Sequence, residues 1–347
     1  MRPASPDQPF VTGTISTPFV LVPVISTRLS AADRLGAWRV RWRIGRDGYK
    51  LDPGLYAIGD PDDLSPVIAT ANYKLTFDVL RSALDGLSAW IVVLDTAGIN
   101  VWCAAGKGTF CHGELAGRLL SDHVDQLVSH RKVVVPQLGA TGVAAHEVRR
   151  LSGFAVVWGP VRAADIPAFL EAGMKATPEM RAPTFTLRDR MRLAPVELVG
   201  TFKPLAWVFA ACLALAALAV RPLAPLPVLL GGLRNAAPAL AAAIGGAVLT
   251  PALLPLLPPR MFAAKGAVVG AVLGAALALA LRPSPLGVAS TLLLSTAGAS
   301  FVAMGFTGST PFTSLSGVER EMRRWLPLQI GGAAASVAAM LLGAMLR

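Results

Sequence analysis

The chain has 347 residues, of which 54% are hydrophobic, and its mean hydropathy is +0.56. This composition is too apolar for an ordinary soluble protein, so part of the chain is expected to lie in lipid. The net charge is +11, but no basic run points to nucleic acid, and the excess is better explained by loop charges that orient membrane helices.

The two halves of the chain differ in composition. Only nine of the 32 basic and two of the 21 acidic residues follow residue 203, where Leu, Ala, Val and Gly dominate. Three cysteines, Cys103, Cys111 and Cys212, form no evenly spaced framework, which favours a reducing compartment over extracellular disulfides. We therefore expect a cytoplasmic domain over residues 1–182, a linker or membrane-surface segment over 183–203, and a transmembrane helical domain over 204–347.

Short apolar runs and helical stretches alternate in the first domain. The runs predict strands over residues 38–44, 55–58, 67–70, 90–94, 133–135 and 155–158. Helices are predicted over residues 74–84, 114–130, 143–151 and 164–172. This order predicts an α/β, Rossmann-like domain with a largely parallel, doubly wound sheet, in which ligands bind beyond the carboxyl ends of the strands.

Beyond this domain, residues 183–199 fit either a strand or a basic segment lying on the membrane surface. About five membrane spans follow, at residues 205–220, 236–257, 263–281, 286–306 and 325–346. They lack the buried charges that mark an ion or proton path, so transport is not indicated. The loop charges predict a multi-pass protein of the inner (cell) membrane with a cytoplasmic N-terminal domain.

The stretch N-V-W-C-A-A-G-K at residues 100–107 follows the strand predicted at 90–94, where a doubly wound sheet places its ligand loops. Asn100 is a good helix N-cap, which would put Trp102 and Cys103 in the first turn. Three small residues follow, Ala104, Ala105 and Gly106. A broad, flat macrocycle could approach such a helix closely.

Residue chemistry alone leaves other interpretations of Cys103 open. A lone cysteine is commonly a small buried hydrophobe. A catalytic nucleophile needs an oriented histidine, and nothing obvious orients His112. Cys103, Cys111 and His112 do not reproduce a paired zinc spacing, and the phosphate-loop interpretation of G-K-G-T at 106–109 fails because Val101 occupies the place of the required glycine.

The 100–107 stretch resembles the cap-helix motif of the HgcA family of mercury-methylating corrinoid proteins. Residues 69–78, 135–148 and 159–170 also resemble that family, as does the layout of a corrinoid-binding domain followed by about five membrane helices. The first domain is similar as well to the corrinoid domain of the corrinoid iron–sulfur protein of acetyl-CoA synthesis.

The resemblance implies a cobalamin-type corrinoid bound base-off, with Cys103 as the lower axial ligand to cobalt. The residues implied to form the cap on that face are Asn100, Val101, Trp102, Ala104, Ala105, Gly106 and Lys107. Those implied near the other face of the corrin are Thr70 and Asn72. Those implied against the corrin or its nucleotide tail are Gly139, Ala140, Gly142 and Val143, in a glycine-rich turn that would otherwise be a tight connection without a ligand.

The same resemblance implies transfer of a methyl group to Hg(II) in an anaerobic setting, forming methylmercury. It implies a ferredoxin-like 4Fe–4S protein, HgcB, as reductant, and methyltetrahydrofolate as methyl source through another protein. The rival hypotheses are a membrane-tethered corrinoid carrier for another metabolic acceptor and a membrane scaffold without corrinoid. Cys111 and His112 depart from the expected pattern, either incidentally or as a secondary mercury site, and the membrane domain is interpreted as an anchor.

Overall fold

The computed structural model describes residues 4–219, 224–309 and 315–346. The chain divides into two compact units. The N-terminal unit comprises Met1–Val40 with Ile44–Pro183, and the C-terminal unit comprises Arg41–Arg43 with Thr184–Arg347.

The N-terminal unit is built on a seven-stranded sheet with the order β1-β2-β3-β5-β4-β6-β7. The strands are β1 (Val11–Ser16), β2 (Leu21–Ile25), β3 (Gly54–Ile58), β4 (Val67–Ala71), β5 (Ala89–Leu94), β6 (Lys132–Val135) and β7 (Ala155–Trp158). The four strands β5, β4, β6 and β7 are parallel, whereas β3 is antiparallel to β5 and β1 is antiparallel to β2. The sheet is therefore mixed, and the predicted parallel arrangement holds for its β5-β4-β6-β7 part.

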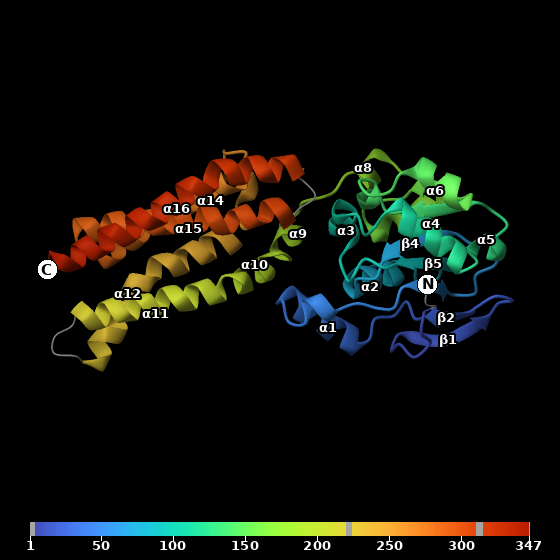
Figure 1. The fold of residues 1–347 in the computed structure, drawn as a ribbon, viewed down its shortest axis with the longest axis horizontal. Helices are drawn as coiled ribbons and strands as arrows, with labels where there is room; N and C mark the ends of the chain where they lie inside the picture. Colours follow the sequence, from blue (N-terminus) through green and yellow to red (C-terminus); the bar gives the residue numbers. More distant parts are fainter. Residues whose placement is uncertain (1–3, 220–223, 310–314, 347) are drawn as a thin grey trace. The chain divides into compact units, whose positions relative to one another are not determined.

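Helices cover both faces of this sheet (Figure 1). They are α1 (Ala31–Arg41), α2 (Lys74–Ala83), α3 (Val101–Lys107), α4 (His112–Ser121), α5 (Val124–Leu127), α6 (Ala145–Ser152), α7 (Ile166–Glu171) and α8 (Pro178–Arg181). Short 3-10 turns lie at Arg46–Gly48, Gln137–Gly139 and Ala163–Asp165. One core joins the sheet to α3, α4 and α6, and a second core joins its other face to α2 and α7.

The two cores follow from the alternation of side chains along each buried strand. In β5, Trp90, Val92 and Leu94 lie in the first core, whereas Ile91 and Val93 lie in the second. A parallel strand covered on both faces is apolar throughout, which is why β3 to β7 are visible in the sequence as short apolar runs.

The strand predicted at residues 38–44 is wrong, because its first part belongs to α1 and its remainder forms a turn. The alternation of Trp and Val with Arg there imitates a strand. A capping box starts the helix instead: the Ser30 hydroxyl accepts from Asp33 N at 3.1 Å, and the Asp33 carboxylate accepts from Ser30 N at 3.0 Å. The prediction also missed β1 and β2.

The helix predicted at residues 114–130 is divided into α4 and α5. Between them His123 has a positive φ of 54°, a left-handed conformation that ends the first helix. The other predicted helices of this unit are present with shifted ends.

The C-terminal unit is helical. Its elements are α9 (Leu187–Met191), α10 (Ala194–Gly200), α11 (Phe202–Ala219), α12 (Pro225–Ile244), a π turn (Gly245–Leu249), α13 (Thr250–Ala252), a 3-10 turn (Leu254–Leu256), α14 (Phe262–Leu281), α15 (Pro285–Ser309) and α16 (Leu315–Met345). The long helices run alongside one another (Figure 1). Residues 187–191 and 194–200 are helical, so the strand interpretation of that segment is wrong.

Within the described residues, four helical segments are long and apolar enough to cross a membrane: Pro225–Ala252, Phe262–Leu281, Pro285–Thr307 and Ser316–Gly343. A fifth results if the pair Leu187–Gly200 and Phe202–Leu218, bent by 43°, counts as one span. These properties are consistent with a membrane protein and with the predicted number of about five.

Glycines and a buried carboxylate hold α14 in place. Gly266 and Gly270, four residues apart, lie against α15, where an added Cβ would be 2.5 Å from Ala303 Cβ and 2.8 Å from Ala299 Cβ, respectively. The Glu321 carboxylate of α16 is buried and accepts from Ala263 N at 2.5 Å, in the first turn of α14. The sequence analysis expected no buried carboxylate in the spans. The Glu321 carboxylate accepts a hydrogen bond from a backbone N–H at the start of α14, which has no partner within that helix.

Candidate functional site

The candidate site lies at a point where the order of the strands reverses. β4 and β6 are neighbours, but β4 leads through α2 to β5 on one side, and β6 leads through α6 to β7 on the other. Successive connections therefore diverge beyond the carboxyl ends of the two strands, which is the usual ligand position in open α/β sheets. The sequence-predicted residues at 70–72, 100–107 and 139–143 all follow or end β4, β5 or β6.

Asn72 organises the loop between β5 and α3 from the end of β4. Its side chain is 2% exposed, and its Oδ1 accepts from Thr96 N at 3.1 Å, Thr96 Oγ1 at 2.8 Å and Gly98 N at 2.9 Å. Its Nδ2 donates to Asp95 Oδ1 at 3.1 Å. The sequence interpretation put Asn72 near a cofactor, whereas the structure occupies its polar atoms with the loop that leads to Cys103.

Helix α3 is short and closed at both ends. The Asn100 side chain accepts from Cys103 N at 2.9 Å, so the predicted N-cap is confirmed. Gly108 ends the helix with a φ of 79°, a left-handed conformation that suits glycine.

The two faces of α3 differ. One face is buried in the core and consists of Val101, Ala104 and Ala105. Trp102 and Cys103 are half-buried, and Gly106 and Lys107 are exposed. An added Cβ on Gly106 would meet nothing within 4 Å, so space stays open one turn along from the Cys103 thiol. The small residues thus have two roles. Ala104 and Ala105 let the helix approach the sheet closely, and Gly106 leaves no side chain on the exposed face of the helix.

The glycine-rich turn after β6 packs against the α3 segment. A Cβ on Gly139 would lie 2.6 Å from the Phe110 ring, and one on Gly142 would lie 2.8 Å from Ala105 Cα. Both glycines therefore allow a close approach between two protein segments. Val143 is buried beside them, whereas Ala140 is exposed at the tip of the turn.

Thr70 lies near the end of β4 and is 2% exposed. Because neighbours along a strand point to opposite faces, its side chain shares the face of Ile68, in the core with α2. Helix α3 packs on the other face, with Ala69 and Ala71. The sheet therefore separates Thr70 from the packed side of α3.

Cys103 brings a single thiol to this part of the site. No group of three or more His, Cys, Asp or Glu side chains that could hold a metal ion occurs in the described part of the chain. Cys103 is a free, half-buried thiol. A single soft sulfur can serve as one axial ligand, whereas a protein-only zinc or iron–sulfur site needs three or four side chains.

Two residues that support this region, Phe110 and Glu114, were not expected from sequence. Phe110 is fully buried between α3 and the glycine-rich turn, and the Glu114 carboxylate accepts from Asp95 N at 3.0 Å. His112, next to the half-buried Cys111, has a buried Nδ1 without a hydrogen-bond partner among the described residues. Only Phe110 could have been predicted from the sequence to be buried, because it is a large aromatic residue within a mostly polar stretch.

A buried ion network supports the start of α2, two residues after Asn72. Lys74 Nζ lies 2.7 Å from Asp33 Oδ1 and 2.6 Å from Asp78 Oδ1, and Arg81 bonds both carboxylates. Burial acts to raise the pKa of Asp33, but hydrogen bonds from Lys74, Ser30 and Arg81 outweigh it and hold that pKa well below its usual value. The network joins α1 to α2.

A second buried carboxylate, that of Asp122, has a raised pKa, in contrast to the lowered pKa of Asp33. Asp122, at the end of α4, is 4% exposed, and its Oδ2 has no hydrogen-bond partner among the described residues. Burial raises the pKa of Asp122 to about 6, although the nearby Arg118 lowers it in part.

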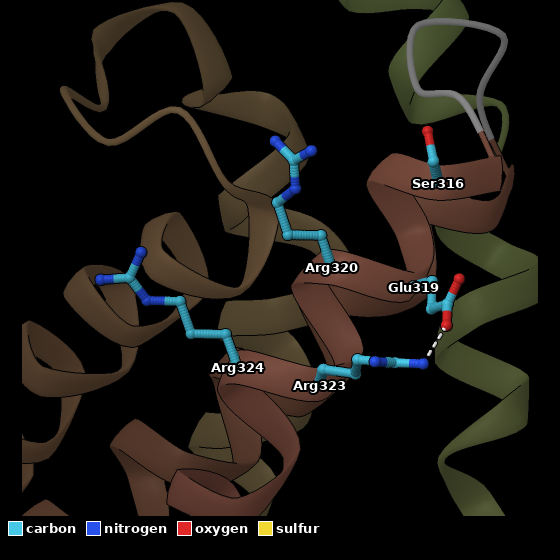
Figure 2. Close-up of a pocket in the computed structure, with 5 residues that line it drawn as sticks. All are labelled: Ser316, Glu319, Arg320, Arg323 and Arg324. Carbon is cyan, nitrogen blue, oxygen red and sulfur yellow. Dashed lines mark hydrogen bonds and ion pairs between the residues drawn. The ribbon is translucent and has the colours of Figure 1, made fainter.

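Two open clefts lie elsewhere. One, of about 470 Å³, is lined by residues of β2, the end of β3 and the segment before β5, at the opposite edge of the parallel strands from Cys103. The other, of about 450 Å³, is formed by the first turns of α16, lined by Ser316, Glu319, Arg320, Arg323 and Arg324 (Figure 2). Arg323 turns back to Glu319, with 2.6 Å between Nη2 and Oε1, so the arginines do not converge on one point.

A match to a protein family lies in the N-terminal unit, and several curated relatives match part of the chain. Residues 45–170 match the family described as CO dehydrogenase/acetyl-CoA synthase delta subunit. The acetyl-CoA decarbonylase/synthase complex subunit gamma of Methanopyrus kandleri is 30% identical over 157 residues, which are 44% of this chain and 31% of that protein. The same subunit of Archaeoglobus fulgidus is 32% identical over 128 residues, covering 36% and 27%.

The corrinoid/iron-sulfur protein large subunit of Moorella thermoacetica is 27% identical over 127 residues, covering 36% of this chain and 28% of that protein. The chain spans about a third of the length of these relatives. Every residue of the candidate site lies inside the matched segment 45–170. The chain is therefore similar over part of its length to subunits of the acetyl-CoA decarbonylase/synthase complex and to a corrinoid/iron–sulfur protein.

Proposed function

We propose that the chain is a membrane-tethered corrinoid protein that transfers methyl groups, with Cys103 as the lower axial ligand to cobalt. The observation that carries this proposal is a half-buried free thiol on a capped helix at the point where the strand order reverses, within the segment that matches the CO dehydrogenase/acetyl-CoA synthase delta subunit family. A corrinoid/iron–sulfur protein is among the relatives of the chain. The lone sulfur fits a metal whose equatorial ligands come from a corrin ring.

The residues around the thiol have separate tasks in this proposal. Asn100 fixes the first turn of α3 through Cys103 N, and Asn72 fixes the loop before it. Trp102, Gly106 and Lys107 lie beside the thiol on the accessible side of α3 and would face the ring. Ala140 and the backbone of its turn would meet the ring or its nucleotide tail.

When bound, the corrinoid supplies a cobalt atom that carries a transferable methyl group. Thiolate is a strong, soft donor, so Cys103 as a ligand would increase electron density on the cobalt and would favour transfer of the methyl group to an electrophile. The cofactor's own base would have to be displaced, because Cys103 takes its position.

For the acceptor we propose Hg(II), a soft electrophile, with methylmercury as the product. Support comes from the 100–107 motif, N-V-W-C-A-A-G-K, which resembles that of the HgcA family. The cobalt would have to be reduced before it accepts another methyl group, and Cys103, Cys111 and Cys212 do not form a cysteine cluster suitable for an iron–sulfur centre. We therefore include a ferredoxin-like reductant, HgcB, and methyltetrahydrofolate as methyl source through another protein.

The second candidate is a membrane-tethered methyl carrier for a metabolic acceptor. It is favoured by the named relatives, which are subunits of acetyl-CoA decarbonylase/synthase complexes or a corrinoid/iron–sulfur protein. Both candidates use the same site and differ in the molecule that receives the methyl group.

Charge on α16 supports a cytoplasmic position for the N-terminal unit. Arg320, Arg323 and Arg324 precede the apolar part of this helix, and Arg320 and Arg324 extend from the side away from Glu319 (Figure 2). Basic residues at the end of a span favour the cytoplasmic side. We therefore propose an inner-membrane protein whose first unit and whose α16 start lie in the cytoplasm.

Cobalt content separates the corrinoid proposals from a scaffold role. The purified full chain should contain cobalt and corrin absorbance, and Cys103→Ala should alter the absorbance spectrum, whereas the control Cys111→Ala should not. A wild-type protein that takes up no corrinoid under reducing conditions would refute both methyl-transfer candidates.

Product assays then distinguish the acceptors. With a reducing ferredoxin partner and a methyl donor, the Hg(II) proposal requires methylmercury from wild type and its loss in Cys103→Ala. Cys103→His should retain some corrinoid and methylate poorly, because imidazole donates less electron density than thiolate. A loaded protein that methylates another acceptor and never Hg(II) would establish the carrier function instead.

A further inference from the structure

Two arginines near the start of α16, Arg320 and Arg324, have no acidic partner among the described residues. Only two acidic residues, Glu319 and Glu321, follow residue 203 in the sequence. Glu319 pairs with Arg323, and the Glu321 carboxylate is buried against the start of α14. Neither carboxylate is left to balance Arg320 and Arg324, which are both exposed.

Packing contacts fix the rotation of α16. Trp325 donates from Nε1 to Met261 Sδ at 3.2 Å, and Gln329 donates from Nε2 to Ser300 Oγ at 2.9 Å. These two residues follow Glu321 at intervals of four, so the three form one side of the helix, which packs inward. The opposite side of α16 faces away from these contacts.

The cleft of about 450 Å³ lies on that outward side (Figure 2). Its lining residues, from Ser316 to Arg324, recur at positions i, i+3, i+4, i+7 and i+8, which form one face of a helix. Arg320 and Arg324 extend to the same side, away from Glu319 (Figure 2). They belong to the second and third turns of α16, so the positive charge comes from side chains and not from the free N–H groups of the helix start.

The part of α16 that follows places this pair of arginines at a membrane boundary. Residues 325–345 carry no charged side chain, and at 1.5 Å per residue they extend about 32 Å, close to the hydrocarbon thickness of a bilayer. Large apolar side chains are exposed along this part, among them Leu328 at 62% and Ile330 at 61%. In the candidate span Ser316–Gly343, Arg320 and Arg324 therefore fall at the level of the lipid headgroups.

We propose that Arg320 and Arg324 bind the phosphate of an anionic phospholipid, whose acyl chains lie along the exposed apolar side of α16. Guanidinium groups form paired hydrogen bonds with phosphate oxygens. Free phosphate would satisfy the arginines and leave the apolar side chains uncovered, whereas a phospholipid satisfies both. The inference depends on membrane insertion of the C-terminal unit and is independent of corrinoid binding.

Native mass spectrometry of the full chain in a neutral detergent tests this site. The probe is phosphatidylglycerol, and phosphatidylcholine with the same acyl chains is the comparison. We expect wild type to retain one phosphatidylglycerol more tightly than any phosphatidylcholine. Arg320→Gln/Arg324→Gln should bind it about thirtyfold more weakly, at about fivefold for each arginine. Arg320→Lys/Arg324→Lys keeps both charges but loses the paired hydrogen bonds, so its affinity should lie between those of wild type and the glutamine variant.

The matched control, Arg234→Gln/Arg282→Gln, removes two exposed arginines at the other end of α14. Arg234 donates to Leu281 O at the end of that helix, whereas Glu321 binds its start. The control should therefore leave the most tightly bound phosphatidylglycerol unchanged. If the double glutamine variant fails to fold, the single variants replace it, each with a loss of about fivefold. Cobalt content measured on the same samples reports corrinoid binding separately.

Four results would overturn the inference. Equal retention of the two lipids would mean that acyl chains alone hold them, and an unchanged affinity in the glutamine variant would place the lipid elsewhere. An equal loss in the test and control variants would mean that total charge governs retention. Inorganic phosphate bound as tightly as phosphatidylglycerol would mean that the site takes free phosphate and not a membrane lipid.

Discussion

Replacing Asn72 by alanine should release the loop that carries Cys103 while leaving the sheet intact. The variant loses the acceptor of three hydrogen bonds, from Thr96 N, Thr96 Oγ1 and Gly98 N, and the donor to Asp95. Thr96 is fully buried, so its backbone N–H has no water to replace the lost bond without local opening.

The magnitude follows from these bonds. At about 1 kcal/mol net for each of three bonds to Oδ1, the closed loop loses about 3 kcal/mol. Since about 1.4 kcal/mol corresponds to a factor of ten, local opening should become roughly a hundredfold more frequent.

Hydrogen exchange measured by mass spectrometry on peptides covering residues 95–103 gives the readout. The amides of Thr96 and Gly98 should exchange about a hundredfold faster in Asn72→Ala, and peptides from β5 should not change. Asn100→Ala is the matched control, because it removes one bond at the start of α3, costs about 1 kcal/mol, and should affect Cys103 N alone. Exchange within twofold of wild type at Thr96 and Gly98 would refute the assigned role of Asn72.

Three further changes test other parts of the unit. Gly142→Ala should cost about 1–3 kcal/mol, because the added methyl group overlaps the backbone of α3, and should lower the melting temperature, whereas Gly106→Ala, which has open space, should not. Asp78→Ala should cost about 3–5 kcal/mol in a denaturant titration, because it leaves the buried Arg81 without that carboxylate, and a loss below 1 kcal/mol would contradict a structural network. The pKa of Asp122 is raised to about 6 from 3.8, so the folded state binds its proton more tightly and stability falls as pH rises from about 4 to 6. Asp122→Asn should abolish that fall and raise the free energy of unfolding by up to about 3 kcal/mol at pH 7. The melting temperature of the variant should then stay level from about pH 4 to 6, where that of the wild type falls.

The buried parallel strands were predictable because sheets covered on both faces leave apolar runs. Asn100 was predictable as a cap for a local reason, since its amide bonds an N–H only three residues away.

Features that depend on tertiary packing were not predictable. The alternation at residues 38–44 indicated a strand, but Ser30 and Asp33 start a helix whose carboxylate is then held by α2. The glycines at 139 and 142 suggested a ligand turn, and it took the structure to place Phe110 and Ala105 against them. Asn72 carries no local sign of its loop bonds, because its partners are more than twenty residues away.

The two-sided character of α3 has a consequence for how the protein is assembled. Its inner face, its cap and the turn behind it are complete through protein contacts alone, so the folding of this unit does not need metal coordination to close its core. Small zinc domains, in contrast, gain their folding energy from the ion. If the proposed function holds, the apoprotein should therefore be able to fold first and take up the corrinoid afterwards, and removal of the cofactor should leave a receptive protein rather than a denatured one.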